Sequence, residues 1–115
     1  MPSSEEDTPK PELLRGTLEM LILKTLSAAP MHGYGIAQHL RQVSKDALRV
    51  EEGSLYPALQ RMRQRGWIKA EWKETPNRQR ARYYRLTPDG RKQLGEEESS
   101  FARILTAISL VMRHS

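Results

Sequence analysis

Residues 54–65 read SLYPALQRMRQR, and this stretch decides the fold because its side chains separate into two faces when it is projected as a helix. At 100° per residue, Leu55, Leu59 and Met62 fall together on one face. The opposite face carries long hydrogen-bonding side chains and no acid: Gly53, Pro57, Gln60, Arg61 and Gln64, with Tyr56 and Arg63 at its margin. We therefore expect a helix that packs on the protein interior through its leucines and offers its polar face to a partner.

Three residues mark the predicted ends of this helix. Ser54 is expected to cap the first turn by accepting a backbone hydrogen bond, and Pro57 is expected within that turn, where its missing N–H costs nothing. Gly66 suits the C-terminal end, because glycine readily adopts the left-handed conformation found there.

Two further helices are predicted before this segment, and a hairpin after it. Residues 12–28 carry a broad apolar surface at helical spacing, which is typical of a helix covered on two sides. A shorter amphipathic helix spans about residues 34–43. After residue 66 the apolar period changes to two in residues 68–73 and again in 81–87, which predicts a β-hairpin with a charged tip. Both tryptophans, Trp67 and Trp72, are expected to pack between this hairpin and the core.

A long final helix is predicted from Pro88 to about Arg113, with Thr87 as its cap. Its apolar residues form a heptad seam for which the monomer offers no remaining partner, so a second subunit is expected to cover it. The expected dimer contacts are Leu14 and Leu18 of the first helix and Leu94, Phe101, Ile104, Leu105, Ile108 and Val111 of the last.

This order of elements predicts a mainly α fold with a small β-hairpin, namely a winged helix-turn-helix followed by a C-terminal dimerisation helix. Residues 1–11, acidic and rich in proline, are expected to form a disordered tail. Residues 12–87 would then form the DNA-binding domain and residues 88–115 the dimerisation helix.

The charge distribution favours a polyanionic partner. The net charge of the chain is +5, yet residues 53–92 contain eleven Lys and Arg against three acids, a local charge of +8. Such a basic segment suits phosphate binding with release of counterions. The candidate DNA contacts are Tyr34 and Tyr56 at helix starts, Ser54, Pro57, Gln60, Arg61 and Gln64 on the third helix, and Arg78, Arg80 and Arg82 in the hairpin.

Catalysis and metal binding are not supported by the residues present. The chain has no cysteine, and His32, His39 and His114 lack the spacing of metal ligands. A phosphate-binding glycine loop, a carboxylate pair and a nucleophile with a base are all missing from the sequence. We expect no enzyme activity, no cofactor and no metal. The sequence also shows no signal peptide and no apolar run of about 18 residues, so we expect a cytoplasmic protein that does not enter a membrane.

Several motifs together resemble the PadR family of transcriptional regulators. They are LRGTLEMLIL at 14–23, HGYGI at 32–36, GSLYPAL at 53–59, GWI at 66–68 and YYRLT at 83–87 with Gly90. The resemblance spans about residues 12–92 and implies a repressor that binds a palindromic operator as a homodimer. By position it assigns DNA contacts to Tyr34, Ser54, Tyr56, Pro57, Gln60, Arg61 and the hairpin arginines. The single helix after the hairpin is similar to the short-tailed members of the family.

Some short-tailed members bind flat aromatic compounds through a tryptophan of the last helix. Here that helix carries Phe101 and no tryptophan, so a small-molecule effector is left undefined. The alternative function is a winged-helix module that binds an acidic protein and has lost DNA binding. An enzyme is disfavoured because no reacting constellation exists, and binding of single-stranded RNA is disfavoured because exposed stacking aromatics are lacking.

Overall fold

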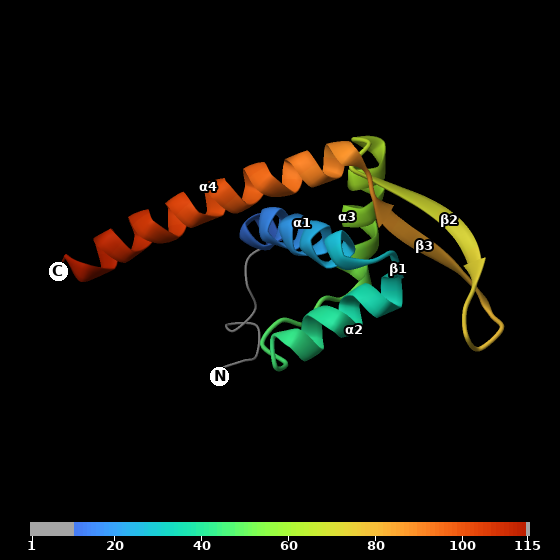
Figure 1. The fold of residues 1–115 in the computed structure, drawn as a ribbon. Coiled ribbons are helices and arrows are strands. Elements are labelled where there is room, and N and C mark those ends of the chain that lie inside the picture. The colour runs from blue at the N-terminus through green and yellow to red at the C-terminus, as the bar shows by residue number, and fades with distance from the viewer. Residues whose placement is uncertain (1–10, 115) are drawn as a thin grey trace.

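The computed structural model describes residues 11–114, with side chains from Gly16 onward. Within this range the chain forms α1 (Pro11–Ala28), β1 (Met31–His32), α2 (Gly33–Val43), α3 (Glu52–Gln64), β2 (Ile68–Glu74), β3 (Arg80–Leu86) and α4 (Pro88–Arg113) (Figure 1). The predicted fold class is confirmed: helices dominate and a hairpin of β2 and β3 projects from them. The expected tail at 1–11 lies outside the described residues apart from its last residue.

A short strand that the sequence prediction missed completes the sheet. Strand β1 pairs antiparallel with β3, so the sheet order is β1-β3-β2, with Met31 opposite Tyr84 and Ile68 opposite Leu86. No strand was predicted between the helices at 12–28 and 34–43. A two-residue strand has no periodicity of its own, and its pairing partners in β3 lie more than 50 residues further along the chain.

Helix α1 lies at the centre of the protein. It packs against α2, α3, α4 and β3, which accounts for its broad apolar surface (Figure 1). Helices α1, α2 and α3 and strand β2 supply the fully buried core: Ile22, Leu23, Ile36, Leu55, Leu59, Met62 and Ile68. Leu18 also belongs to this core at 2% exposure, so the expectation that it contacts a second subunit is corrected.

Helix α3 starts two residues earlier than predicted. Glu51 occupies the N-cap position, and the Ser54 N–H donates to the Glu51 carbonyl oxygen at 2.9 Å. Ser54 is therefore a first-turn residue and not the cap, and Pro57 lies inside the helix. The end was predicted correctly: Gly66 has φ +77°, and the Gly66 and Trp67 N–H groups donate to the carbonyls of Arg63 and Met62.

Helix α4 begins as predicted and then leaves the body of the protein. The Thr87 hydroxyl accepts from the Gly90 N–H at 3.0 Å, which caps the first turn. Leu94 is 7% exposed and packs into the core, so it cannot serve the dimer contact expected of it. From Phe101 to His114 every residue is exposed, and this half of α4 extends away from the other helices (Figure 1).

Candidate nucleic-acid interface

The outward face of α3 carries most of the side chains that the helical projection placed there. Leu55, Leu59 and Met62 are buried, as predicted. Ser54, Tyr56, Pro57, Gln60 and Gln64 are exposed. This face therefore presents hydroxyl, phenol and amide groups, which can hydrogen-bond to phosphates and base edges.

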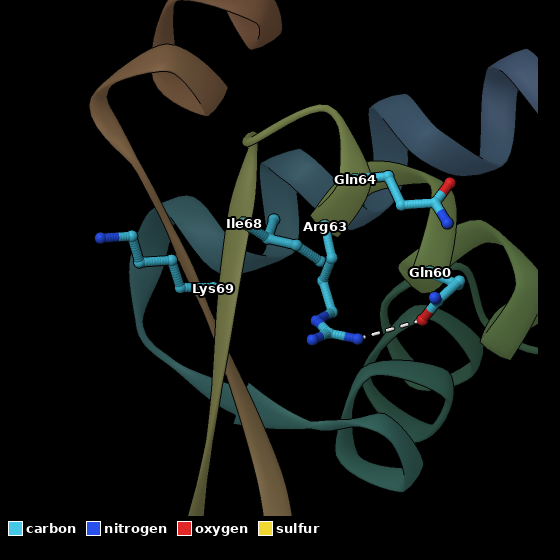
Figure 2. Close-up of a pocket in the computed structure, with 5 residues that line it drawn as sticks. All are labelled: Gln60, Arg63, Gln64, Ile68 and Lys69. Carbon is cyan, nitrogen blue, oxygen red and sulfur yellow. Dashed lines mark hydrogen bonds between the residues drawn. The ribbon is translucent and has the colours of Figure 1, made fainter.

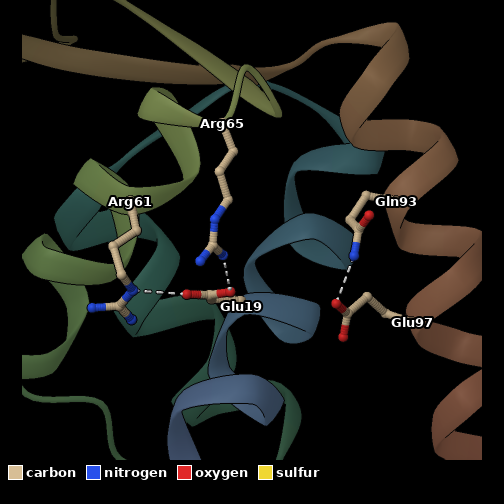
Figure 3. Close-up of polar contacts among 5 residues, drawn as sticks. All are labelled: Glu19, Arg61, Arg65, Gln93 and Glu97. Atoms are coloured by element: carbon tan, nitrogen blue, oxygen red, sulfur yellow. Dashed lines mark hydrogen bonds and ion pairs between the residues drawn. The ribbon is translucent and has the colours of Figure 1, made fainter.

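Arg61 departs from the projection. Its Nε donates to Glu19 Oε2 of α1 at 2.9 Å, and its side chain is only 27% exposed (Figure 3). Arg65, the C-cap residue directly after α3, donates from Nη1 to the other oxygen of Glu19 at 3.4 Å. The expectation of a fully outward Arg61 is thus corrected. A projection fixes only the direction of the Cα–Cβ bond, whereas the long side chain bends along the flank of α3 toward a buried carboxylate.

Gln60 and Gln64 border a small pocket between α3 and β2. The pocket has a volume of about 250 Å³ and is lined by Gln60, Arg63, Gln64, Ile68 and Lys69 (Figure 2). The Arg63 Nη1 donates to Gln60 Oε1 at 3.0 Å, which orients the amide. Arg63 and Lys69 were not among the predicted contacts, because only the tertiary structure brings β2 beside the outer face of α3.

A second pocket joins the starts of α2 and α3 to the hairpin. It has a volume of about 390 Å³ and is lined by His32, Gly33, Tyr34, Tyr56, Trp72, Ala81, Arg82 and Tyr84. Tyr34, 67% exposed, and Tyr56, 43% exposed, both line it. Tyr34 lies at the start of α2 as predicted, but Tyr56 lies in the second turn of α3 because that helix begins at Glu52. Burial, and then the nearby Glu52 carboxylate, raise the pKa of Tyr56 above its ordinary value. Its hydroxyl therefore stays protonated at neutral pH and can donate to a phosphate oxygen.

His32 fixes the start of α2 at this pocket. Its Nδ1 accepts a hydrogen bond from the Gly35 N–H at 2.9 Å, so the imidazole acts as the N-cap of the helix. Its ring also meets Tyr83 of β3 edge to face, with centroids 5.2 Å apart. The side chain thus ties the start of α2 to the sheet.

The hairpin, which we call the wing, carries the remaining predicted contacts. Arg78 lies in its turn with φ +65°, and Arg80 lies over the Trp72 ring at 5.5 Å. Trp72 is 58% exposed, so the expectation that it packs on the core is wrong. The alternation placed it on the correct side of β2, but the wing extends beyond the core at that point. Trp67, close to the base of the wing, does pack against the core as expected.

The exposed half of α4 carries a continuous apolar stripe. Its members are Phe101, Ile104, Leu105, Ile108, Val111 and Met112, all exposed. At 100° per residue they lie within about 120° of one another around the helix. Leu14, expected beside this stripe, has a side chain outside the described part of the structure. Neither a metal-binding group of His, Asp or Glu nor a helix long and apolar enough to cross a membrane occurs in the described residues.

Comparison with known proteins assigns the family. Residues 22–96 match the model of the transcriptional regulator PadR-like family. The chain belongs to this family. Among its curated relatives is transcriptional regulator Rv3488 of Mycobacterium tuberculosis, 32% identical over 93 residues, which cover 81% of this chain and 83% of that protein. The PadR resemblance in the sequence motifs is thereby confirmed.

Solved structures of PadR-family and other regulators share the fold. A transcriptional regulator from Clostridium thermocellum superposes with a TM-score of 0.78 and 28% identity, over 85% of this chain and 95% of that one. A PadR-like transcriptional regulator from Bacillus cereus gives a TM-score of 0.76 and 29% identity, over 90% and 99% of the two chains. The family and these neighbours are transcriptional regulators, which supports DNA binding through the winged helix.

Proposed function

We propose that this PadR-family regulator binds a palindromic operator in double-stranded DNA as a homodimer and represses transcription. One observation supports this most: the pocket lined by Tyr34, Tyr56 and Arg82 joins α2, α3 and the wing in one surface. A winged helix needs those three elements on one side of the protein. Helix α3 can then enter a major groove while α2 and the wing, on either side of it, contact the DNA backbone.

Each element of this surface is assigned a role. The amides of Gln60 and Gln64 contact base edges, for which adenine offers the matching donor and acceptor pair. Tyr34 contacts a phosphate at the start of α2, helped by the backbone N–H groups there, whereas Tyr56, in the second turn of α3, contacts a phosphate through its hydroxyl alone. Ser54 and Pro57 approach the same strand. Arg78, Arg80 and Arg82 of the wing contact flanking phosphates or the minor groove. Arg61 is held by Glu19 and is given no base-reading role.

The homodimer is proposed to form through the apolar stripe of α4. A stripe of six large apolar side chains, with Ile104 52% exposed near its middle, is unusual on a free surface. A second copy of α4 would cover it with the same residues, in the isologous contact of a two-fold dimer. The two α3 helices would then enter successive major grooves about 34 Å apart. An effector that alters this spacing would regulate binding, and the protein would act in the cytoplasm.

Selection from a random duplex pool tests the proposal. The full chain is incubated with duplexes that carry a randomised region, and bound fragments are sequenced over several rounds. We expect an inverted repeat whose half-site centres lie about 10 base pairs, or a multiple of this, apart. Binding to the selected duplex should fall steeply with salt and exceed binding to a scrambled duplex by about 10³-fold or more. Failure to enrich any sequence would favour the protein-interaction module instead. Repression is then tested with a reporter whose promoter carries the selected site.

A further inference from the structure

Glu19 of α1 is a buried carboxylate that faces the recognition helix. Its side chain is 7% exposed, and each of its two oxygens accepts from a different arginine, Arg61 of α3 at 2.9 Å and Arg65, the C-cap of α3, at 3.4 Å (Figure 3). Burying a carboxylate is costly unless it is paired, so this arrangement holds α3 against α1. No other described acid forms an ion pair with α3 in this structure.

The two arginines are the chain neighbours of the two proposed base-reading residues. Arg61 follows Gln60 and Arg65 follows Gln64, so holding the two arginines adds to the buried apolar face of α3 in setting the rotation of this helix about its own axis. That rotation decides whether both glutamine amides point at the base edges. Contacts to phosphates tolerate a small displacement of the recognition helix, whereas hydrogen bonds to base edges do not. A misplaced helix would therefore keep its phosphate contacts and lose its base contacts.

The same contact pairs positive charge of the two arginines with a carboxylate, so that this charge is less available to DNA. Both guanidinium groups lie on the flank of α3, beside the face proposed to enter the groove. Without the Glu19 carboxylate neither guanidinium would have an ion-pair partner among the described residues, although Arg65 would still lie over the Trp67 ring at 5.0 Å. Both could then bind phosphates of any sequence, which would raise non-specific affinity. Arg61 is the more strongly held, because its bond is shorter and its side chain is less exposed than that of Arg65.

We propose that Glu19 is a positioning residue for operator specificity, which acts through Arg61. We call the contact of Glu19 with Arg61 and Arg65 the clamp. It orients the face of α3 that carries Gln60 and Gln64, and it suppresses sequence-independent binding. Arg61 forms part of this clamp and does not read a base. The proposal rests on the DNA-binding function proposed above. Since α1 also packs on α4, the clamp connects the recognition helix to the helix that carries the apolar stripe.

A double-mutant cycle tests the clamp on DNA. The full-length wild type, Glu19→Gln, Arg61→Gln and the double variant are titrated with a fluorescent random-sequence 30-base-pair duplex and with the selected operator, from 50 to 200 mM NaCl. For Glu19→Gln we expect about 3–10-fold tighter binding to the random duplex and a salt slope steeper by about 1–2, the effect of one or two added phosphate contacts. The ratio of operator to random affinity should fall about tenfold.

Two comparisons make the result specific to this contact. Glu96→Gln on the exposed face of α4 makes the same charge change, and it should alter the affinity ratio less than about twofold. In the Arg61→Gln background, Glu19→Gln should alter the ratio less than about threefold, because the side chain through which Glu19 acts is gone. The proposal would be overturned if Glu19→Gln had the same operator-to-random affinity ratio and salt slope as Glu96→Gln. It would also be overturned if Glu19→Gln changed the affinity ratio equally in the wild-type and Arg61→Gln backgrounds.

Thermal unfolding of the same four proteins separates the clamp from the DNA-binding function. Glu19→Gln should lower the Tm by about 5 °C or more, and the double variant should be no less stable than Arg61→Gln alone. This non-additive effect of the two substitutions on Tm should appear even if the duplex selection finds no operator. Additive losses of Tm would overturn the clamp, and they would do so even if the protein binds its operator. If Glu19→Gln does not fold, the paired replacement of Glu19 and Arg61 by Met keeps the site filled and is expected to fold with a reduced affinity ratio.

Discussion

The phenol of Tyr56 lies directly against the backbone of Gly33, so close that a methyl group on Gly33 would come within 2.7 Å of the Tyr56 hydroxyl oxygen. This contact sets the start of α2 against the first turns of α3. It also explains why glycine, and no larger residue, follows His32 in this chain: a side chain at this position would occupy the place of the tyrosine ring.

Gly33→Ala should therefore weaken DNA binding by displacing the Tyr56 ring from its phosphate contact. We expect a loss of about 1–2 kcal/mol in operator binding, comparable to Tyr56→Phe, which removes the hydroxyl alone. Fluorescence anisotropy with the selected duplex measures both. Gly16→Ala is the matched control, because a methyl group there would meet no described atom within 4 Å, and it should leave binding unchanged. Wild-type affinity in Gly33→Ala would show that the ring can move at no cost.

Gln60→Ala should cost about 1–3 kcal/mol on the operator and relax the preference at one base position of each half-site. The cause is loss of an amide that is held by a hydrogen bond from Arg63 and is proposed to contact a base edge. Repeating the duplex selection with the variant measures this preference. Gln42→Ala, on the exposed end of α2, is the control. Equal weakening on every sequence would assign Gln60 to the backbone instead.

Arg78→Asn should lower the salt slope of DNA binding by about 0.9, the effect of one phosphate contact, without changing the selected sequence. Asparagine is chosen because Arg78 has φ +65°, a left-handed conformation that asparagine tolerates well. The slope is read from titrations between 50 and 200 mM NaCl. An unaltered slope would show that the turn of the wing stays clear of the duplex.

Ile104→Glu should place a charge in the middle of the apolar stripe and yield monomers with much weaker operator binding. Sedimentation velocity measures the oligomeric state. Thr106→Glu, about 160° away from Ile104 around α4, carries the same new charge on the opposite side of the helix and should remain dimeric. A dimer in the Ile104→Glu protein would place the interface elsewhere.

Patterns local to the chain determined much of this fold. The helical period of residues 54–65, the change to a period of two after Gly66 and the capping residues at 87–89 each depend on backbone chemistry within a few residues. For that reason the order of helices and hairpin, the buried leucines of α3 and the start of α4 were all predictable. The motifs around Gly33 and Tyr56 indicated the family by their resemblance to those of PadR regulators.

Contacts between distant segments could be found only in the tertiary structure. Glu19 and Arg61 are 42 residues apart, and nothing in the spacing of either one indicates the ion pair. Leu94 and Phe101 both fit one heptad seam, yet the seam is covered by α1 at its beginning and exposed after it. Trp72 alternates correctly on its strand but lies where the wing has left the core. Periodicity sets the direction in which a side chain leaves its own helix or strand, whereas the packing of one element on another decides what that side chain meets.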